Sequence, residues 1–450
     1  MKALRYRLYA INRPTILIFT AAVFCFFLIN PISTFGQKHH LKKNNTFAAE
    51  NAAWCWFSDP RAVYYKGEKE AIYYGFINSS GDVMAKSFDL ETGETSEHTL
   101  HESLQIDDHN VPTFLFLPDR KILTFYNHHN GDIFMRKSKR SEDITQWEQE
   151  VIILKEDSIN RYCYTNPIML SEENNRIYLF GRNLVRNREG AYLDTRIYCI
   201  YSDNYGETWS PEVNLLYNDG RNNPQYVKYT SDNKSRIDFL FTNGHPKLGS
   251  DISVHHIYYQ NGHFRQTSGE KIGTFENLPI SIKNTNKMHD ANKTGVRAWI
   301  WDIALDKNSN PVVTYTQYPD EQNHEYYYAR WDGNKWINKK IVNSGSYITI
   351  IKPSEKIKEA HYSGGIVLDH NNPSDVYLSR TVNNKFEIVK YEVNQKENLK
   401  MESITSNSNL DNIRPYIVDG NPTETPILLW MSGNYFHYTD YDTSLRILIK

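Results

Sequence analysis

The chain has 450 residues, with 51 Lys and Arg against 53 Asp and Glu, and this near-neutral balance argues against a general nucleic-acid binder. Aromatic residues make up 14% of the chain, an excess that suits β-strands. The length allows one large all-β domain or two ordinary domains.

The first 36 residues have the pattern of a secretory signal. Basic residues precede an apolar run over 15–29, and small residues follow up to Gly36. We therefore expect 1–36 to be a signal peptide, 37–50 a polar spacer and 51–450 the folded catalytic domain. The protein would then be secreted or periplasmic, with no stable membrane insertion after cleavage. An uncleaved membrane anchor is the alternative.

Three cysteines follow the predicted signal, namely Cys55, Cys163 and Cys199. Their odd number and wide spacing exclude a disulfide scaffold and a paired CxxC metal site. We expect buried free thiols, and a bridge between Cys163 and Cys199 is the alternative.

A repeated pattern begins at Trp54. Each unit has a short strand, a polar turn, a more apolar strand, a loop and a longer polar-aromatic strand. It occurs in seven segments, at 54–100, 112–154, 166–217, 225–268, 301–342, 362–404 and 414–449. Four strands in about 40 to 50 residues are typical of a propeller blade. The sequence predicts an all-β fold, a seven-bladed β-propeller of four-stranded antiparallel blades.

One local motif supports this fold. The stretch 202–209 resembles the Asp-box, the hairpin signature of sialidase-like propellers, with Asn204 at the usual aspartate position. The Asx side chain would bind its own turn backbone, and Trp209 would pack between sheets. Such a motif indicates the fold and carries no information about activity.

Polar residues flank a predicted hairpin in the second segment. Two short strands are expected on either side of a turn at Pro118, with Asp-Asp-His-Asn at 107–110 before them and His128-His129 after them. A hairpin brings its ends together, so His109 should lie near this pair, and strand alternation turns only one of the two toward a site. Two imidazoles there could donate and accept protons near neutral pH. Polar strand ends satisfied by backbone and water are the alternative.

Tyr164, just before the third segment, and Arg182, within it, lie at the corresponding strand ends. Together with the histidines they suit the elimination of a 4-linked sugar from a uronic acid. In that reaction a base removes the C5 proton, a cation or hydrogen bonds disperse charge on the adjacent carboxylate, and an acid protonates the leaving oxygen. Arginine offers a planar, two-pronged match for a carboxylate.

Five further stretches point in the same direction, at 54–65, 107–112, 242–246, 301–306 and 362–366. Together they resemble the BNR-repeat family of seven-bladed propeller polysaccharide lyases, which includes the ulvan lyases and the rhamnosyl-glucuronate lyases. The resemblance covers essentially the whole chain from Trp54 onward. It implies an exported lyase that cleaves a uronic-acid-containing, rhamnose-rich and ulvan-like glycan by β-elimination at a 4-linked uronate.

The resemblance also implies residue roles. The family's paired catalytic histidines match His109 and His129, its tyrosine matches Tyr164, and its carboxylate-neutralising arginine matches Arg182. Tyr162 is an alternative for the tyrosine.

Substrate contacts are expected from Arg61, His128 and Tyr226. The family commonly shows an Arg-Pro-Tyr run around Tyr226, whereas this chain has Asn-Pro-Gln-Tyr at 223–226. We therefore expect altered subsite preference.

No cofactor is required for this chemistry. Some relatives hold a metal in the propeller, so a structural calcium or zinc ion is a further expectation, with His245, Asp302 and His324 as the main candidate ligands and His255, His256 and His361 as others. A hydrogen-bonded polar ring is the alternative.

The expected partner is an anionic polysaccharide, bound by a monomer. Two other functions remain open: a glycoside hydrolase of the sialidase or rhamnosidase type, and a non-catalytic glycan-binding propeller. Of the arginines that a sialidase gathers, only Arg61 fits.

Overall fold

The computed structural model describes residues 46–221, 223–320, 323–345, 364–393, 399–421 and 426–449. The predicted signal peptide and His361 lie outside these ranges. Leu41–Lys450 form one compact unit. None of the described helices is long and apolar enough to cross a membrane.

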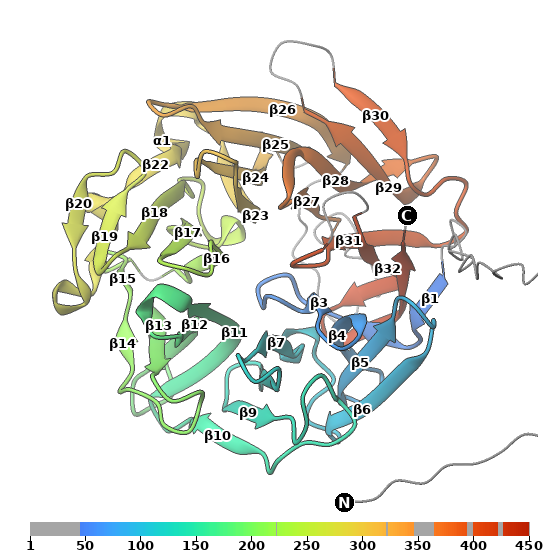
Figure 1. The fold of residues 1–450 in the computed structure, drawn as a ribbon. Helices are drawn as coiled ribbons and strands as arrows, with labels where there is room; N and C mark the ends of the chain where they lie inside the picture. Colours follow the sequence, from blue (N-terminus) through green and yellow to red (C-terminus); the bar gives the residue numbers. More distant parts are fainter. Residues whose placement is uncertain are drawn as a thin grey trace, which may run out of the picture. The chain divides into compact units, whose positions relative to one another are not determined.

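Seven antiparallel sheets are arranged in a ring, as the sequence predicted (Figure 1). The first blade contains β2 (Ala52–Ala53), β3 (Ala62–Lys66), β4 (Glu70–Asn78), β5 (Val83–Asp89) and β6 (Thr95–His101), and the second contains β7 (Thr113–Phe116), β8 (Ile122–Asn127), β9 (Ile133–Lys137) and β10 (Val151–Leu154). The third contains β11 (Asn160–Leu170), β12 (Arg176–Arg186), β13 (Tyr192–Ser202) and β14 (Val213–Asn214). The fourth contains β16 (Tyr226–Ser231), β17 (Arg236–Thr242), β18 (Val254–Gln260), β19 (His263–Gln266), β20 (Lys271–Gly273) and β22 (Asn286–His289).

The last three contain β23 (Arg297–Leu305), β24 (Pro311–Tyr318), β25 (His324–Trp331) and β26 (Trp336–Gly345); β27 (Ile366–Asp369), β28 (Asn372–Val382), β29 (Lys385–Glu392) and β30 (Lys400–Ser403); and β31 (Asp411–Ile417), β32 (Leu428–His437), β33 (Asp440–Leu448) and β1 (Thr46–Ala49). A short parallel pair, β15 (Leu216–Tyr217) and β21 (Ile280–Ser281), lies outside the blades. The helices are short: η1 (Asp108–Asn110), η2 (Ser171–Glu173), η3 (Pro246–Leu248), η4 (Phe275–Asn277), η5 (Ile282–Asn284) and α1 (Ala291–Thr294).

Two blades depart from the four-strand expectation. The first blade has five strands, because both β2 and β3 pair with β4, and the fourth has six. The seventh is completed by β1, which pairs with β33 and so joins the two ends of the ring. The structure therefore places a strand inside the predicted spacer at 37–50. Its four residues, Thr-Phe-Ala-Ala, are too short a stretch to show a strand period.

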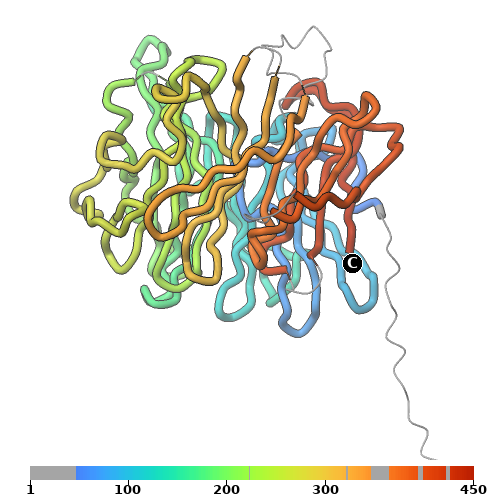
Figure 2. Tube along the Cα trace, turned by 90° about the horizontal axis from the view of Figure 1, so that it is seen from above, coloured from blue at the N-terminus to red at the C-terminus, as the bar shows by residue number. Residues whose placement is uncertain are grey.

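Strand alternation explains how neighbouring blades pack. In β8, Ile122 and Tyr126 lie in a core cluster shared with the first blade, whereas Leu123 and Phe125 lie in a cluster shared with the third. Each blade thus buries both faces of its middle strands. Figure 2, turned by 90°, shows that the strands of successive blades run between the same two faces of the unit.

The Asp-box is a structural turn, as predicted. Asn204 Oδ1 accepts the backbone N–H of Thr208 at 2.9 Å, and Trp209 packs edge-on against Phe125 of the neighbouring blade. Cys55, Cys163 and Cys199 are free and buried, so the alternative bridge is not formed.

The segment between β2 and β3, residues 54–61, fills the centre of the ring. Trp56 stacks on Trp301 with ring centroids 4.5 Å apart, and Phe57 packs against Tyr226 at 4.8 Å. Asn166 ties the segment down, since its side-chain amide donates to the carbonyl of Phe57 and its oxygen accepts the N–H of Asp59. The segment separates two cavities that lie toward opposite ends of the inner strands.

Candidate active site

The first cavity, of about 270 Å³, lies near the starts of the inner strands. It is lined by Cys55, Trp56, Phe57, Asp108, His109, His129, Tyr164, Tyr226, His245, Lys247, Arg414, Tyr435, His437 and Tyr438. These residues come from five blades, so the cavity forms only when the ring has closed.

Two imidazoles share one carboxylate at this cavity. His109 Nδ1 lies 2.6 Å from Asp107 Oδ1, and His129 Nδ1 lies 2.8 Å from Asp107 Oδ2. The rings are stacked, with centroids 3.9 Å apart and planes 8° apart. Because a carboxylate accepts hydrogen bonds, both rings carry a proton on Nδ1 and present Nε2 to ligands.

Local structure sets this arrangement. Asp107 caps η1, since its Oδ1 also accepts the backbone N–H of His109 at 3.0 Å. His129 follows β8, and its own N–H donates to the side chain of Gln105. The hairpin prediction is confirmed, and so is the alternation: His128 packs against Phe134 at 5.3 Å and does not line the cavity.

The shared carboxylate separates the two imidazole pKa values. Burial lowers the pKa of His109, but Asp107 and Asp108 outweigh it and raise that pKa to about 9. Burial and the charge on His109 lower the pKa of His129 to about 4. Burial works against the charge of Asp107, yet the two imidazoles hold its pKa well below the usual range. At neutral pH one ring is an acid and the other a base.

A second buried carboxylate lies behind the pair and has its own counter-ion. Asp108 Oδ2 accepts from Arg414 Nη1 and from the Tyr435 hydroxyl, both at 2.5 Å. Asp108 Oδ1 lies 3.1 Å from His109 Nδ1. Asp108 therefore supports His109 while its charge is balanced by Arg414.

A β-bulge brings Tyr164 into the cavity. The register of β11 against β12 shifts between Cys163 and Asn166, and Tyr164 has φ of 68°, which is rare for a bulky residue. Its ring lies 5.7 Å from that of His109. The alternative residue, Tyr162, instead bonds Glu212 at 2.8 Å and lies outside the cavity.

Gly181 makes room for the bulge. The Tyr164 carbonyl accepts a hydrogen bond from the Tyr198 hydroxyl at 2.7 Å. A Cβ at Gly181 would lie 2.3 Å from that carbonyl oxygen and 2.6 Å from the Tyr198 ring.

Arg182 differs from the other buried arginines of the described chain. Arg61, Arg236 and Arg414 each form an ion pair with an aspartate. Arg182 is 5% exposed and forms no ion pair with any described carboxylate. Its Nε has no hydrogen-bond partner, Nη2 makes a 3.5 Å contact with Asn130, and the guanidinium also hydrogen-bonds the Tyr226 side chain.

Two phenol rings lie between this charge and the cavity. The Arg182 guanidinium lies 4.8 Å from the Tyr164 ring and 5.1 Å from the Tyr226 ring, and both tyrosines line the cavity. Burial raises the pKa of Tyr164 well above its usual range, and Arg182 opposes that rise. The structure thus brings together His109, His129, Tyr164, Arg182 and Tyr226.

The other predicted residues are spread over the unit. Arg61 bonds Asp59 at 2.8 Å and packs on Tyr416, outside this cavity. His245 lines the cavity beside Trp299, and its Nδ1 accepts the N–H of Lys247.

The three main metal candidates do not form a cluster. Asp302 pairs with His370 at 3.1 Å elsewhere, and His324 is buried beside Tyr326. Among the described residues, the groups close enough to share one ion are Cys55, Asp108 and His109, and Asp107, His109 and His129. In both, the Nδ1 of each histidine already bonds a carboxylate.

Sequence reasoning missed Asp108, Arg414 and Lys247 as parts of the site. The two adjacent aspartates before His109 were a local signal, because an acid beside an imidazole sets its charge. Arg414 had no such signal, since it is 306 residues from Asp108.

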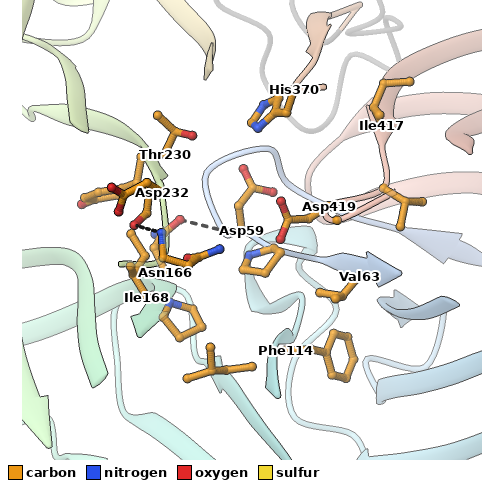
Figure 3. Close-up of a pocket in the computed structure, with 18 of the residues that line it drawn as sticks. Asp59, Val63, Phe114, Asn166, Ile168, Thr230, Asp232, His370, Ile417 and Asp419 are labelled. Carbon is orange, nitrogen blue, oxygen red and sulfur yellow. Dashed lines mark hydrogen bonds between the residues drawn. The ribbon is translucent and has the colours of Figure 1, made fainter. Parts of the chain in front are cut away.

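The second cavity, of about 610 Å³, lies at the ends of the inner strands (Figure 3). Asp59, Asp302 and Asp419 line it with His370. Asp59 pairs with Arg61 and Lys228, and Asp302 with His370. Burial and the charges of Asp59 and Asp302 raise the pKa of Asp419. Asp59 and Asp302 therefore have their counter-charges within the protein.

A family model described as a BNR repeat-containing family member matches residues 71–344. No curated protein matches the chain. An ulvan lyase of a new polysaccharide lyase family, bound to -[GlcA(1-4)Rha3S]-, has a similar structure with 15% identity and a TM-score of 0.67, over 91% of this chain and 96% of that chain. A second ulvan lyase structure of this new polysaccharide lyase family is similar at 16% identity and a TM-score of 0.67, over 91% of this chain and 96% of that chain.

A more distant structure is an α-L-arabinofuranosidase from Fusarium graminearum, with 11% identity and a TM-score of 0.46 over 90% of this chain and 98% of that chain.

Proposed function

The chain belongs to the BNR repeat-containing family, and from this premise we propose that it is a polysaccharide lyase. Its substrate would be a uronic-acid-containing, rhamnose-rich glycan of the ulvan type, cleaved by β-elimination at a 4-linked uronate. The saccharide in the similar ulvan lyase structure belongs to this class. The N-terminal pattern supports the further proposal that the enzyme acts outside the cytoplasm.

One observation carries the proposal. Arg182 is buried behind the Tyr164 and Tyr226 rings that line the cavity, and no described carboxylate pairs with it. A buried cation without a described ionic partner is costly, so such a site is suited to an anion supplied by the ligand. The carboxylate of a uronate is such an anion, and guanidinium binds it with two hydrogen bonds.

The remaining groups fit the proton transfers. The C5–H bond breaks and its electron pair forms the C4=C5 double bond, while the C4–O bond breaks and the glycosidic oxygen takes a proton. His129, whose pKa is lowered to about 4, has a free base at Nε2. His109, whose pKa is raised to about 9, offers an acidic Nε2–H, and Tyr164 lies beside it. These three would share proton removal and return, while Arg182 disperses the carboxylate charge.

The direct test is to mix the purified protein with ulvan and with other uronic-acid polymers and to follow the ultraviolet absorbance of a 4,5-unsaturated uronate. A rise supports the lyase. New reducing ends without that absorbance would indicate a hydrolase, and binding without either would indicate a glycan-binding module.

A pair of variants on one strand sharpens this test. Arg182→Ala should lower kcat/KM about 10²–10³-fold, the usual loss when one charge-stabilising group is removed. Arg176→Ala is the matched control, because Arg176 also lies on β12 and packs on a tyrosine but pairs with Asp203 at the surface. Equal activities of the two variants would contradict the role of Arg182.

A further inference from the structure

We propose that Asp107 is a positioning residue that makes His109 and His129 a single proton-carrying unit, in which one positive charge is shared by two stacked rings and both Nε2 atoms are held toward the cavity. This inference rests on the proposed lyase function for its catalytic meaning. Its geometry is independent of the substrate.

The first argument is the position of the carboxylate. Each oxygen of Asp107 receives one imidazole, at 2.6 Å and 2.8 Å, and the residue is 1% exposed. Both imidazoles line the cavity, whereas Asp107 does not. The carboxylate therefore binds the rings from behind and selects the same tautomer in each.

The second argument is the balance of charge. Among the described residues, the cationic groups within ion-pair distance of Asp107 are His109 and His129. Asp108 differs, because Arg414 of β31 and Tyr435 of β32 already bind it. Asp107 thus supplies one negative charge that no described cation other than the imidazole pair balances, which is enough for one imidazolium. A second proton would place two positive charges on rings whose centroids are 3.9 Å apart.

Other groups facing the pair oppose a second charge. Arg182 of β12 acts on His129 by Coulomb repulsion, and burial disfavours any additional ion. Tyr438 packs edge-on against both rings, and Tyr164 approaches His109. Lys247 of η3 lines the same cavity and adds positive charge. His245 and His437 also line it, and burial lowers the pKa of each.

A purely structural role for Asp107 makes a different prediction. Asp107 also caps η1, and an asparagine could keep that bond through its Oδ1. It has one acceptor oxygen and no charge, so it could not accept Nδ1–H from both rings. Asp107→Asn therefore keeps the cap and removes the proposed function.

The experiment is an NMR titration of the imidazole resonances of the full mature chain in the presence of a chelator, with assignments from His109→Gln and His129→Gln. We expect the wild type to show two well-separated steps, one above and one below the ordinary histidine value of about 6.5. In Asp107→Asn both titration steps should move toward the ordinary histidine pKa. In His129→Gln the remaining step of His109 should stay high, because both carboxylates remain.

The control is Asp132→Asn. Asp132 lies three residues after His129 and accepts the N–H of Glu156, which an asparagine can also do. The variant should leave both steps in place. Circular dichroism should show the same fold for both variants, and if Asp107→Asn does not fold, the wild-type and His129→Gln titrations still decide the outcome.

Kinetics on a uronate polymer give the second readout. Asp107→Asn should lower kcat about 10²-fold with little change in KM, within the range for general acid–base groups. The alkaline limb of the kcat-against-pH profile of this variant should move to lower pH. The proposal would be overturned if the two imidazoles of the wild type titrate independently near the ordinary histidine pKa. It would also be overturned if the two titration steps are unchanged in Asp107→Asn. If the two titration steps move together in Asp107→Asn but the wild type has no lyase activity, the proposed histidine unit stands and the proposed lyase function is rejected.

Discussion

The two cavities at opposite ends of the inner strands differ in how their charges are balanced. In the second cavity, Asp59 and Asp302 have cationic partners within the protein. Behind the wall of the first cavity, Arg182 has no described carboxylate partner, and the two imidazoles share the carboxylate of Asp107. The larger cavity, of about 610 Å³ against about 270 Å³, is therefore not the better candidate. Uncompensated charge is a better guide than volume, because a site for a charged ligand must keep a counter-charge available.

The largest effect should come from removing either stacked imidazole. His109→Ala and His129→Ala should each lower kcat about 10²–10⁴-fold, since each removes an acid or a base. His128→Ala is the matched control, because His128 follows the same strand but packs against Phe134. Lyase assays on all three variants check the prediction. Full activity in either of the first two would show that the chemistry occurs elsewhere.

A smaller effect is expected from closing the space behind the bulge. Gly181→Ala would push on the Tyr164 carbonyl and the Tyr198 ring. Overpacking of this kind costs about 1–3 kcal/mol of unfolding free energy, and we expect a roughly tenfold loss of kcat because Tyr164 moves. Urea unfolding and kinetics would measure the two effects. Gly262→Ala has open space around its Cβ but a φ of 79°, so it should destabilise without lowering kcat.

The pH dependence of stability tests the histidine unit without substrate. The folded-state pKa of His109, about 9, lies above its unfolded value of about 6.5. Its contribution is therefore fully present below pH 6.5 and is lost as the pH rises through 9. The folded-state pKa of His129, about 4, is below the unfolded value, so stability also falls as the pH drops from 6.5 toward 4.

Thermal unfolding across this range should show a Tm that declines on the alkaline side, and the decline should be smaller in His109→Gln. His128→Gln should keep the wild-type slope. An unchanged slope in His109→Gln would contradict the raised pKa.

Local patterns predicted the ring of blades and one half of the site. The period of two in β8 predicted that only one of His128 and His129 faces the site, and the hairpin turn predicted that His109 lies at the same end. The family resemblance selected His129, which the structure places against Asp107, while His128 packs against Phe134. These are short-range effects of strand geometry. The closure by β1 and the contact of Arg414 with Asp108 join residues hundreds of positions apart. No local period encodes them, because they depend on how the complete ring closes.

The position of Arg182 was predicted only in part. The sequence predicted that Tyr164 and Arg182 lie at corresponding strand ends. The structure pairs Arg182 with Cys163, and the bulge turns the Tyr164 ring between the guanidinium and the cavity. A register shift of this kind depends on the packing of Gly181 and Tyr198 and is not visible in a hydrophobic pattern. The role of Tyr226 as a second covering ring follows from the same packing.

The smallest effect should come from the second cavity. Asp419→Asn removes a carboxylate whose pKa burial and its neighbours Asp59 and Asp302 already raise, so it relieves repulsion at neutral pH. We expect lyase activity within about twofold of the wild type and a Tm that is unchanged or slightly higher, because the neutral amide is no longer repelled by Asp59 and Asp302. A large loss of activity with intact folding would show that the two cavities are coupled. The difference in charge balance would then no longer separate a working cavity from a structural one.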